Sequence, residues 1–145
     1  VDNIIRMSKA GNVGVGTSSA ATYKFRVQGD IYASADVIAY SDARVKENVV
    51  TIDNALHKVT NIRGVYYTRK DIENKERNIG VIAQEVLKVV PELVSYSEVD
   101  DQYAVKYQNI TALLIEAIKE LNTTINKLEH DNTELRSRIT TLEGQ

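Results

Sequence analysis

Two residues near position 40 have the side chains that a small serine peptidase needs, Ser41 and Lys46, five positions apart. A serine hydroxyl attacks a peptide carbonyl only after a base removes its proton. Lysine can be that base when it is neutral, so its usual pKa of about 10.4 must fall by several units through burial or a nearby positive charge. Arg44 is a candidate for that charge, and the Tyr40–Ser41 peptide bond is the candidate substrate.

The spacing of this pair is weak evidence by itself. Five residues along a helix separate two side chains by about 140°, and on a straight strand they face opposite sides. A Ser–Lys dyad therefore requires a turn between Ser41 and Lys46, or a lysine from another copy of the chain. The alternative interpretation is that Ser41 and Asp42 cap a turn and that Lys46 is a solvated charge.

Other candidate sites are weaker. Gly11, Gly14 and Gly16 resemble a phosphate-binding loop, but no Lys-Ser/Thr pair and no helix follow them. The acidic run 98–101 lacks the regular ligand spacing of a calcium loop, so we expect a solvated turn there. The two histidines, His57 and His130, are far apart, and the chain has no cysteine. We therefore expect no cofactor and no metal site.

The composition excludes two classes of partner. The chain has 145 residues and a net charge of −2, so it has no basic surface for nucleic acid. No apolar run approaches the roughly 18 residues that would span a membrane. The length suits one domain or two small ones. Because residue 1 is Val, we expect this sequence to be a piece of a longer chain.

Residues 1–40 have the pattern of short strands joined by tight turns. Residues 11–17 alternate glycine with β-branched side chains, and residues 25–32 alternate apolar and polar side chains with a turn signal at Gly29-Asp30. Forty such residues cannot bury a core alone. We therefore expect an intertwined β-structured fibre end, completed by strands from other copies.

Residues 41–106 have the pattern of a small mixed globular domain. The helix at 53–59 should begin near Asp53, and the helix at 83–90 should stop at Pro91. The predicted remainder comprises a strand at 64–68, a charged loop at 69–77, the start of a buried strand or turn at 78–82, and a hairpin of 93–96 with 103–105 across the acidic turn.

Residues 107–143 have the heptad pattern of a coiled-coil helix. The seam has leucine at d and, with one exception, isoleucine at a; it consists of Leu114, Ile118, Leu121, Ile125, Leu128, Asn132, Leu135, Ile139 and Leu142. The g-to-e pairs Asp131/Arg136 and Arg138/Glu143 attract in a parallel arrangement. Asn132 at an a position would fix the register, and isoleucine at a with leucine at d favours a dimer.

Several separate motifs, in order, resemble one family. They are Ser41-Asp42-x-Arg44-x-Lys46, Gly80-Val81-Ile82-Ala83-Gln84-Glu85-Val86, Pro91-Glu92-Leu93-Val94, and the helical run Leu113 to Leu121. The family is the C-terminal intramolecular chaperone, or auto-processing domain, of bacteriophage tail spikes and tail fibres, as in endosialidases. The resemblance covers roughly residues 41–143, and the glycine-rich segments upstream look like the fibre ends that precede this domain.

The resemblance implies a self-cleaving chaperone that forms a homotrimer. Such a domain brings three fibre chains into register and then cuts itself off before the serine of its Ser-Asp motif. Ser41 would be the nucleophile, Lys46 the base, and the cut would lie between Tyr40 and Ser41. Residues 1–40 would then belong to the fibre shaft in the virion. Residues 41–145 (41–106 globular, 107–143 coiled coil) would be released in the infected cell's cytoplasm.

Together these observations predict an α+β protein with a β fibre end, a small globular domain and a long coiled-coil helix. Two other functions stay open. One is a non-enzymatic trimeric fibre tip, an adhesion module with a permanent coiled coil. The other is a processing domain of a membrane-tethered transcription factor, which the family also includes. The glycine-rich leader and the absence of a basic surface argue against the latter.

Overall fold

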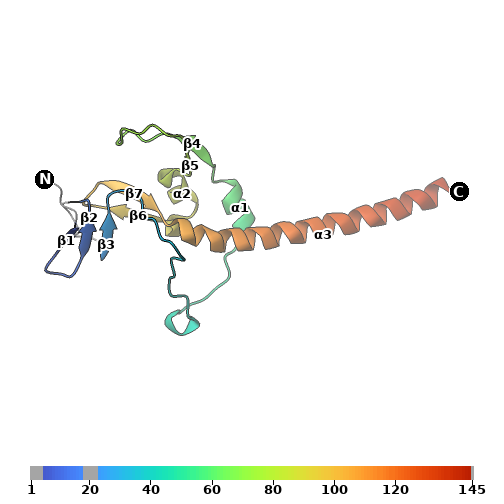
Figure 1. The fold of residues 1–145 in the computed structure, drawn as a ribbon. Helices are drawn as coiled ribbons and strands as arrows, with labels where there is room; N and C mark the ends of the chain where they lie inside the picture. The colour runs from blue at the N-terminus through green and yellow to red at the C-terminus, as the bar shows by residue number, and fades with distance from the viewer. Residues whose placement is uncertain (1–4, 18–22, 145) are drawn as a thin grey trace. The chain divides into compact units, whose positions relative to one another are not determined.

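The computed structural model describes residues 5–17 and 23–144 and has an α+β fold (Figure 1). Its contacts divide the chain into two units. One unit comprises residues 1–49 and 97–102, and the other comprises residues 50–96 and 103–145. The boundary that we predict between Tyr40 and Ser41 is a functional one, and it stays a prediction.

The first unit contains a small three-stranded sheet. Strand β2 (Val13–Val15) pairs antiparallel with β1 (Ile5–Met7) and parallel with β3 (Phe25–Val27). A tight turn joins β1 to β2, and Gly11 has a φ of 73° within it, a conformation that glycine adopts without steric cost. The predicted short strands and tight turns are confirmed in the described part of this region.

The second unit contains the elements predicted for the globular segment, each within two residues of its expected bounds. They are α1 (Ala55–Thr60), β4 (Val65–Tyr67), β5 (Asn78–Gly80) and α2 (Ala83–Val89). Strands β4 and β5 pair antiparallel. The expectation of burial is wrong for β5, because Ile79 is 74% exposed. Helix α2 ends at Val90 because Pro91 cannot continue it. The hairpin of β6 (Val94–Ser97) and β7 (Gln102–Val105) follows.

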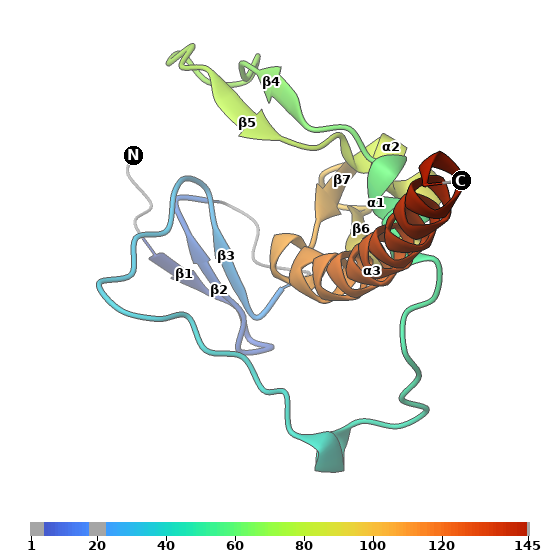
Figure 2. The ribbon, with the colours of Figure 1, turned by 90° about the vertical axis from the view of Figure 1, so that its right-hand side faces the viewer.

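The buried core lies where α1 and α2 meet the start of the long helix α3 (Ile110–Glu143). Figure 2 looks along α3 from its C-terminal end and shows α1 beside it. The core side chains come from four elements and are Ala55, Val86, Leu93, Leu113 and Ala117. Leu113 and Ala117 are four residues apart, so they share one face of α3. That face holds the globular segment together.

The N-terminus of α1 is capped by a side chain from α3. Glu120 accepts hydrogen bonds from the backbone N–H groups of Ala55 (2.8 Å) and Leu56 (2.9 Å). We expected Asp53 near this cap, but Asn54 occupies the cap position without a side-chain bond to the helix. The carboxylate of Asp53 instead contacts Lys58 at 3.2 Å. The long helix therefore satisfies two donors that the local sequence leaves open.

Residue 80, in the second of the four motifs, has no room for a side chain, which explains the glycine there. A Cβ atom on Gly80 would lie 2.7 Å from the Tyr107 hydroxyl and 3.2 Å from the Tyr67 ring. That hydroxyl also lies 3.4 Å from the backbone nitrogen of Val81. Tyr107 begins the short 3₁₀ helix Tyr107–Asn109 that leads into α3, so the absence of a side chain at residue 80 lets β5 approach the start of that helix.

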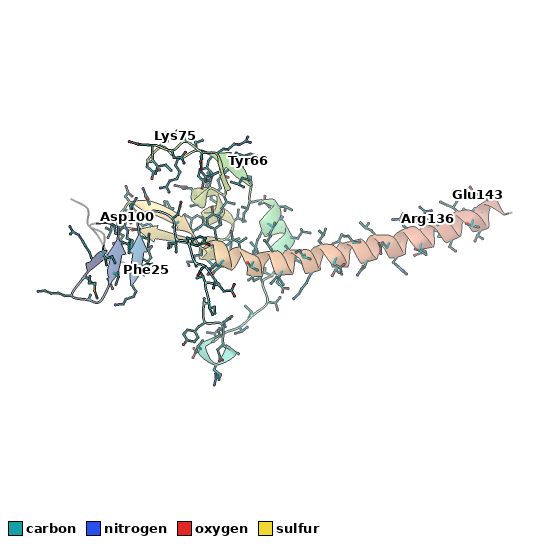
Figure 3. All side chains as sticks on the ribbon, in the orientation of Figure 1. Phe25, Tyr66, Lys75, Asp100, Arg136 and Glu143 are labelled. Carbon is teal, nitrogen blue, oxygen red and sulfur yellow. The ribbon has the colours of Figure 1, made fainter. Side chains whose placement is uncertain are left out.

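The heptad seam of α3, which adjoins the core face, is exposed along the length of the helix. At 1.5 Å per residue, its 34 residues extend about 51 Å. The eight leucine and isoleucine residues of the heptad seam are between 42% and 71% exposed. Figure 3 shows the side chains of the last turns, around Arg136 and Glu143, projecting freely. Among the described residues, no helix is both long and apolar enough to cross a membrane.

We predict that Glu120→Ala destabilises the globular segment by about 1–2 kcal/mol, because two N–H groups at the start of α1 lose their acceptor. Urea unfolding at a fixed protein concentration measures this change. Glu134→Ala, an exposed position on the same helix, is the control and should cost less than about 0.5 kcal/mol. Equal stability of the two variants would show that the cap contributes nothing.

Candidate active site

Residues 41–46 form a single turn on an otherwise extended segment. A short 3₁₀ helix spans Ala43–Val45, and Figures 1 and 2 show it as an isolated teal coil. The side chain of Asp42 caps the turn by accepting a hydrogen bond from the Arg44 N–H at 2.8 Å. The Lys46 N–H donates to the Ala43 carbonyl at 3.1 Å and closes the turn. This is the local reversal that the five-residue spacing requires.

The turn brings the two candidate catalytic side chains into contact. Lys46 Nζ donates a hydrogen bond to Ser41 Oγ over 2.8 Å, within the usual range for such a bond. Both groups belong to one chain, so no second copy is needed for the contact. A nucleophile within hydrogen-bond reach of its base is the geometric requirement for nucleophilic catalysis.

Arg44 does not take the role that the sequence suggested for it. Its guanidinium pairs with both oxygens of Asp42, with a shortest distance of 2.6 Å. The hydrogen bonds from Arg44 lower the pKa of Asp42, and the carboxylate raises the pKa of Arg44. Because the positive charge of Arg44 is compensated by Asp42, it is a poor source of the repulsion that would neutralise Lys46. Arg44 instead stabilises the turn.

The whole turn is open to water in the single chain. Ser41 and Lys46 are exposed, and Tyr40, on the other side of the candidate peptide bond, is 98% exposed. The peptide bond is therefore accessible. Burial favours the neutral form of an amine, and the single chain provides no burial at Lys46. Any burial of Ser41 and Lys46 must therefore come from residues outside this segment.

The other candidate residues belong to other elements of the chain. His57 lies within α1, where its ring is 3.3 Å from Asn61 Nδ2, and His130 is exposed on α3. The glycine pattern at 11–16 belongs to the β1–β2 hairpin and not to the start of a helix. Within the described ranges, no three His, Cys, Asp or Glu side chains gather as metal ligands would.

The acidic turn 98–101 contains an interaction that the sequence analysis missed. Asp100 accepts hydrogen bonds from Arg26 Nη2 at 2.6 Å and from Ser97 Oγ at 2.8 Å. The hydrogen bonds from Ser97 and Arg26 lower the pKa of Asp100. The expected solvated turn is therefore wrong for Asp100, which binds the first unit's sheet. No short-range sequence signal reveals a pair 74 residues apart.

Comparison with known proteins shows that part of the chain is similar to one family. Residues 41–95 match the family model described as "Chaperone of endosialidase". Residues 41–95 are therefore similar to this family. The match begins at Ser41 and includes the turn with Lys46, α1, the β4–β5 pair and α2.

The similar curated proteins are phage long tail fibres. The chain is 31% identical to the long tail fiber protein Gp37 of Enterobacteria phage K3 in an alignment of 141 residues that covers 88% of this chain and 11% of that protein. It is 33% identical to Gp37 of Enterobacteria phage Ox2 in an alignment of 138 residues that covers 87% of this chain and 55% of that protein. Gp37 of Escherichia phage AR1 is 41% identical in an alignment of 75 residues that covers 46% of this chain and 7% of that protein. The chain thus spans between 7% and 55% of the length of these relatives.

We predict that the turn depends on ionised Asp42. Because the pKa of Asp42 is lowered, the turn persists at and above the ordinary aspartate value of 3.8 and is lost as the pH falls through the lower value. The Arg44 amide resonance, followed by NMR against pH, should shift with a midpoint below 3.8. Asp42→Asn is the control, and its Arg44 amide should not titrate. A midpoint above 3.8 would contradict this assignment.

Proposed function

We propose that this chain is a self-cleaving intramolecular chaperone of a phage tail fibre. In this proposal, Ser41 attacks the carbonyl carbon of Tyr40 and Lys46 accepts the serine proton. The bond from Tyr40 to the nitrogen of Ser41 breaks, and that nitrogen takes up a proton as it leaves. Water then hydrolyses the ester that joins Tyr40 to Ser41 Oγ. Residues 1–40 stay with the fibre, and residues 41–145 are released as the chaperone.

The observation that carries the proposal is the 2.8 Å contact between Lys46 Nζ and Ser41 Oγ at the first position of the family match. The family implies an autoproteolytic serine peptidase. The exposed Tyr40–Ser41 bond adjoins the pair, so no rearrangement of a folded core is needed to reach it. The long tail fibre relatives support a place in the virion tail fibre for the N-terminal part.

The active assembly in this proposal is a homotrimer. The exposed seam of α3 needs partners, because eight large apolar side chains would otherwise remain in water. A parallel coiled coil would hold three upstream segments close together and fix their register. The isoleucine and leucine pattern alone favours two strands, so we assign the third chain to contacts of the globular and fibre segments. Asn132 is exposed on the seam and is available to such partners.

Assembly would also control the cut. The single chain leaves Ser41 and Lys46 in water, whereas neighbouring copies would bury them and favour the neutral amine. A chain would then be cut only after correct assembly. An interleaved β fibre forms slowly because its contacts are non-local. Removing its template after assembly leaves the fibre trapped by its own unfolding barrier.

A second candidate function is a non-enzymatic fibre tip with a permanent coiled coil. The exposure of Ser41 and Lys46 favours it, because a solvated lysine is a poor base. In this alternative, the chain stays at 16.2 kDa indefinitely. Intact mass measurement of freshly made and aged protein distinguishes the two functions.

We predict that Ser41→Ala and Lys46→Arg each reduce self-cleavage at least about a thousandfold, because one removes the nucleophile and the other provides a side chain that stays charged. Mass spectrometry of denatured protein should detect pieces 1–40 and 41–145 in the wild type and only intact chain in the variants. Ser34→Ala, an exposed serine upstream, is the matched control and should be cut normally. A cut at the same bond in Ser41→Ala would refute the role of Ser41.

We predict that Ile125→Asp converts the trimer to single chains, because a charge in the seam has to be buried without a partner. Light scattering measures the mass, and self-cleavage should slow at least about tenfold in the same variant. Thr123→Asp, at an outward-facing heptad position, is the control and should remain trimeric. Ile125 is 44% exposed in the single chain, so its replacement leaves the core intact. Full-speed cleavage in single chains would show that assembly does not control the cut.

A further inference from the structure

We propose that the turn of the β6–β7 hairpin is a latch that holds the two cleavage products together after the peptide bond is cut. The latch consists of Asp100 in the turn, Ser97 at the end of β6 and Arg26 on strand β3. Its partner is therefore the N-terminal product of the same chain. The inference rests on the proposed cut between Tyr40 and Ser41 and goes beyond it, because it concerns how the products separate.

The latch has the geometry of a specific contact. Arg26 Nη2 lies 2.6 Å from one oxygen of Asp100, and Ser97 Oγ donates to the other oxygen over 2.8 Å. The hydroxyl thus orients the carboxylate toward the guanidinium. The Arg26 side chain is only 18% exposed and that of Asp100 only 26% exposed. In Figure 3, Asp100 lies beside the sheet that carries Phe25, the neighbour of Arg26.

The contact connects the two sides of the proposed cut. Arg26 lies in the segment 1–40, and Ser97 and Asp100 lie in the segment 41–145. Residues 97–102 belong by their contacts to the first unit, although both flanking stretches of chain, 50–96 and 103–145, belong to the second. Cutting at residue 40 removes the covalent link and leaves this contact in place. The cut alone would therefore not free the chaperone.

The chemistry of the latch makes release sensitive to salt. Ser97 and Arg26 lower the pKa of Asp100, so the carboxylate is charged at neutral pH. Salt screens a partly exposed ion pair far more than it affects apolar packing. Three copies of a weak contact in one trimer act together, so each of them need only be modest. Release then requires either screening or a shift of β3 as the fibre completes its folding.

The test measures how long the two products stay together. Wild-type protein is allowed to cut itself, and native size-exclusion chromatography with mass analysis of each peak follows the products. At about 0.05 M salt they should co-elute, and at about 1 M salt they should separate. Arg26→Gln and Asp100→Asn should each shorten the lifetime of the complex about tenfold or more at low salt. The charge swap Arg26→Asp with Asp100→Arg should restore most of it.

Matched controls separate the latch from general charge effects. Glu98→Gln removes a charge from the same turn, and Arg6→Gln removes one from strand β1 of the sheet that carries Arg26; both side chains are exposed. Both controls should keep the wild-type lifetime. The proposal is overturned if wild-type products separate immediately at low salt. It is equally overturned if Arg26→Gln and Asp100→Asn behave as the controls do.

A second arm keeps this test independent of self-cleavage. The Ser41→Ala chain carries a recognition sequence for an added protease between Ala35 and Asp36, in an exposed segment without regular structure. Cutting there also leaves Arg26 and Asp100 on different pieces. If the wild type never cuts itself, the proposed function fails, and this arm still decides the latch. If the wild type cuts but both arms release at once, only the latch fails.

Discussion

The packing of α1 on the first turns of α3 is the contact on which the second unit depends. Leu113 and Ala117 supply the apolar surface, and Glu120, one turn further on, supplies the cap of α1. Helix α1 has only six residues, too few to be stable alone. Its position therefore comes from α3. Without that helix, the small core of Ala55, Val86 and Leu93 loses its largest partner.

The same helix has a second apolar face that the chain itself does not cover. One face of α3 packs on the globular segment at its start, and the other presents the heptad seam to water along its length. A chain of this size can bury only a limited part of its apolar surface. The proposed homotrimer accounts for the seam, and it connects folding of each globular segment with assembly through one continuous helix.

In these proposals, the chaperone is released in two separate steps, the cut in the chain and the opening of the latch. The turn at residues 41–46 holds the proposed nucleophile and base together on an exposed, extended segment, where the proposed cut would not require a core to open. The Arg26–Asp100 contact lies elsewhere and joins the sheet of the first unit to the β6–β7 turn. A template that is cut and still held can keep the fibre strands in register until their own contacts are complete. Because the proposed cut and the proposed latch involve different residues, each step can be controlled independently.

Local sequence patterns determined the elements, and tertiary structure decided which distant groups meet. The strand and helix bounds between residues 53 and 105 and the heptad helix followed from periodicity, Pro91 and turn residues, which act over a few positions. The Ser41–Lys46 spacing required a turn, and its Asp42 cap is a local interaction as well. By contrast, the Glu120 cap, the contact of Tyr107 with Val81 beside Gly80 and the Arg26–Asp100 pair join residues 26 to 74 positions apart. A charge pattern cannot specify such pairs, because many exposed carboxylates are equivalent until the packing of helices and sheets selects one.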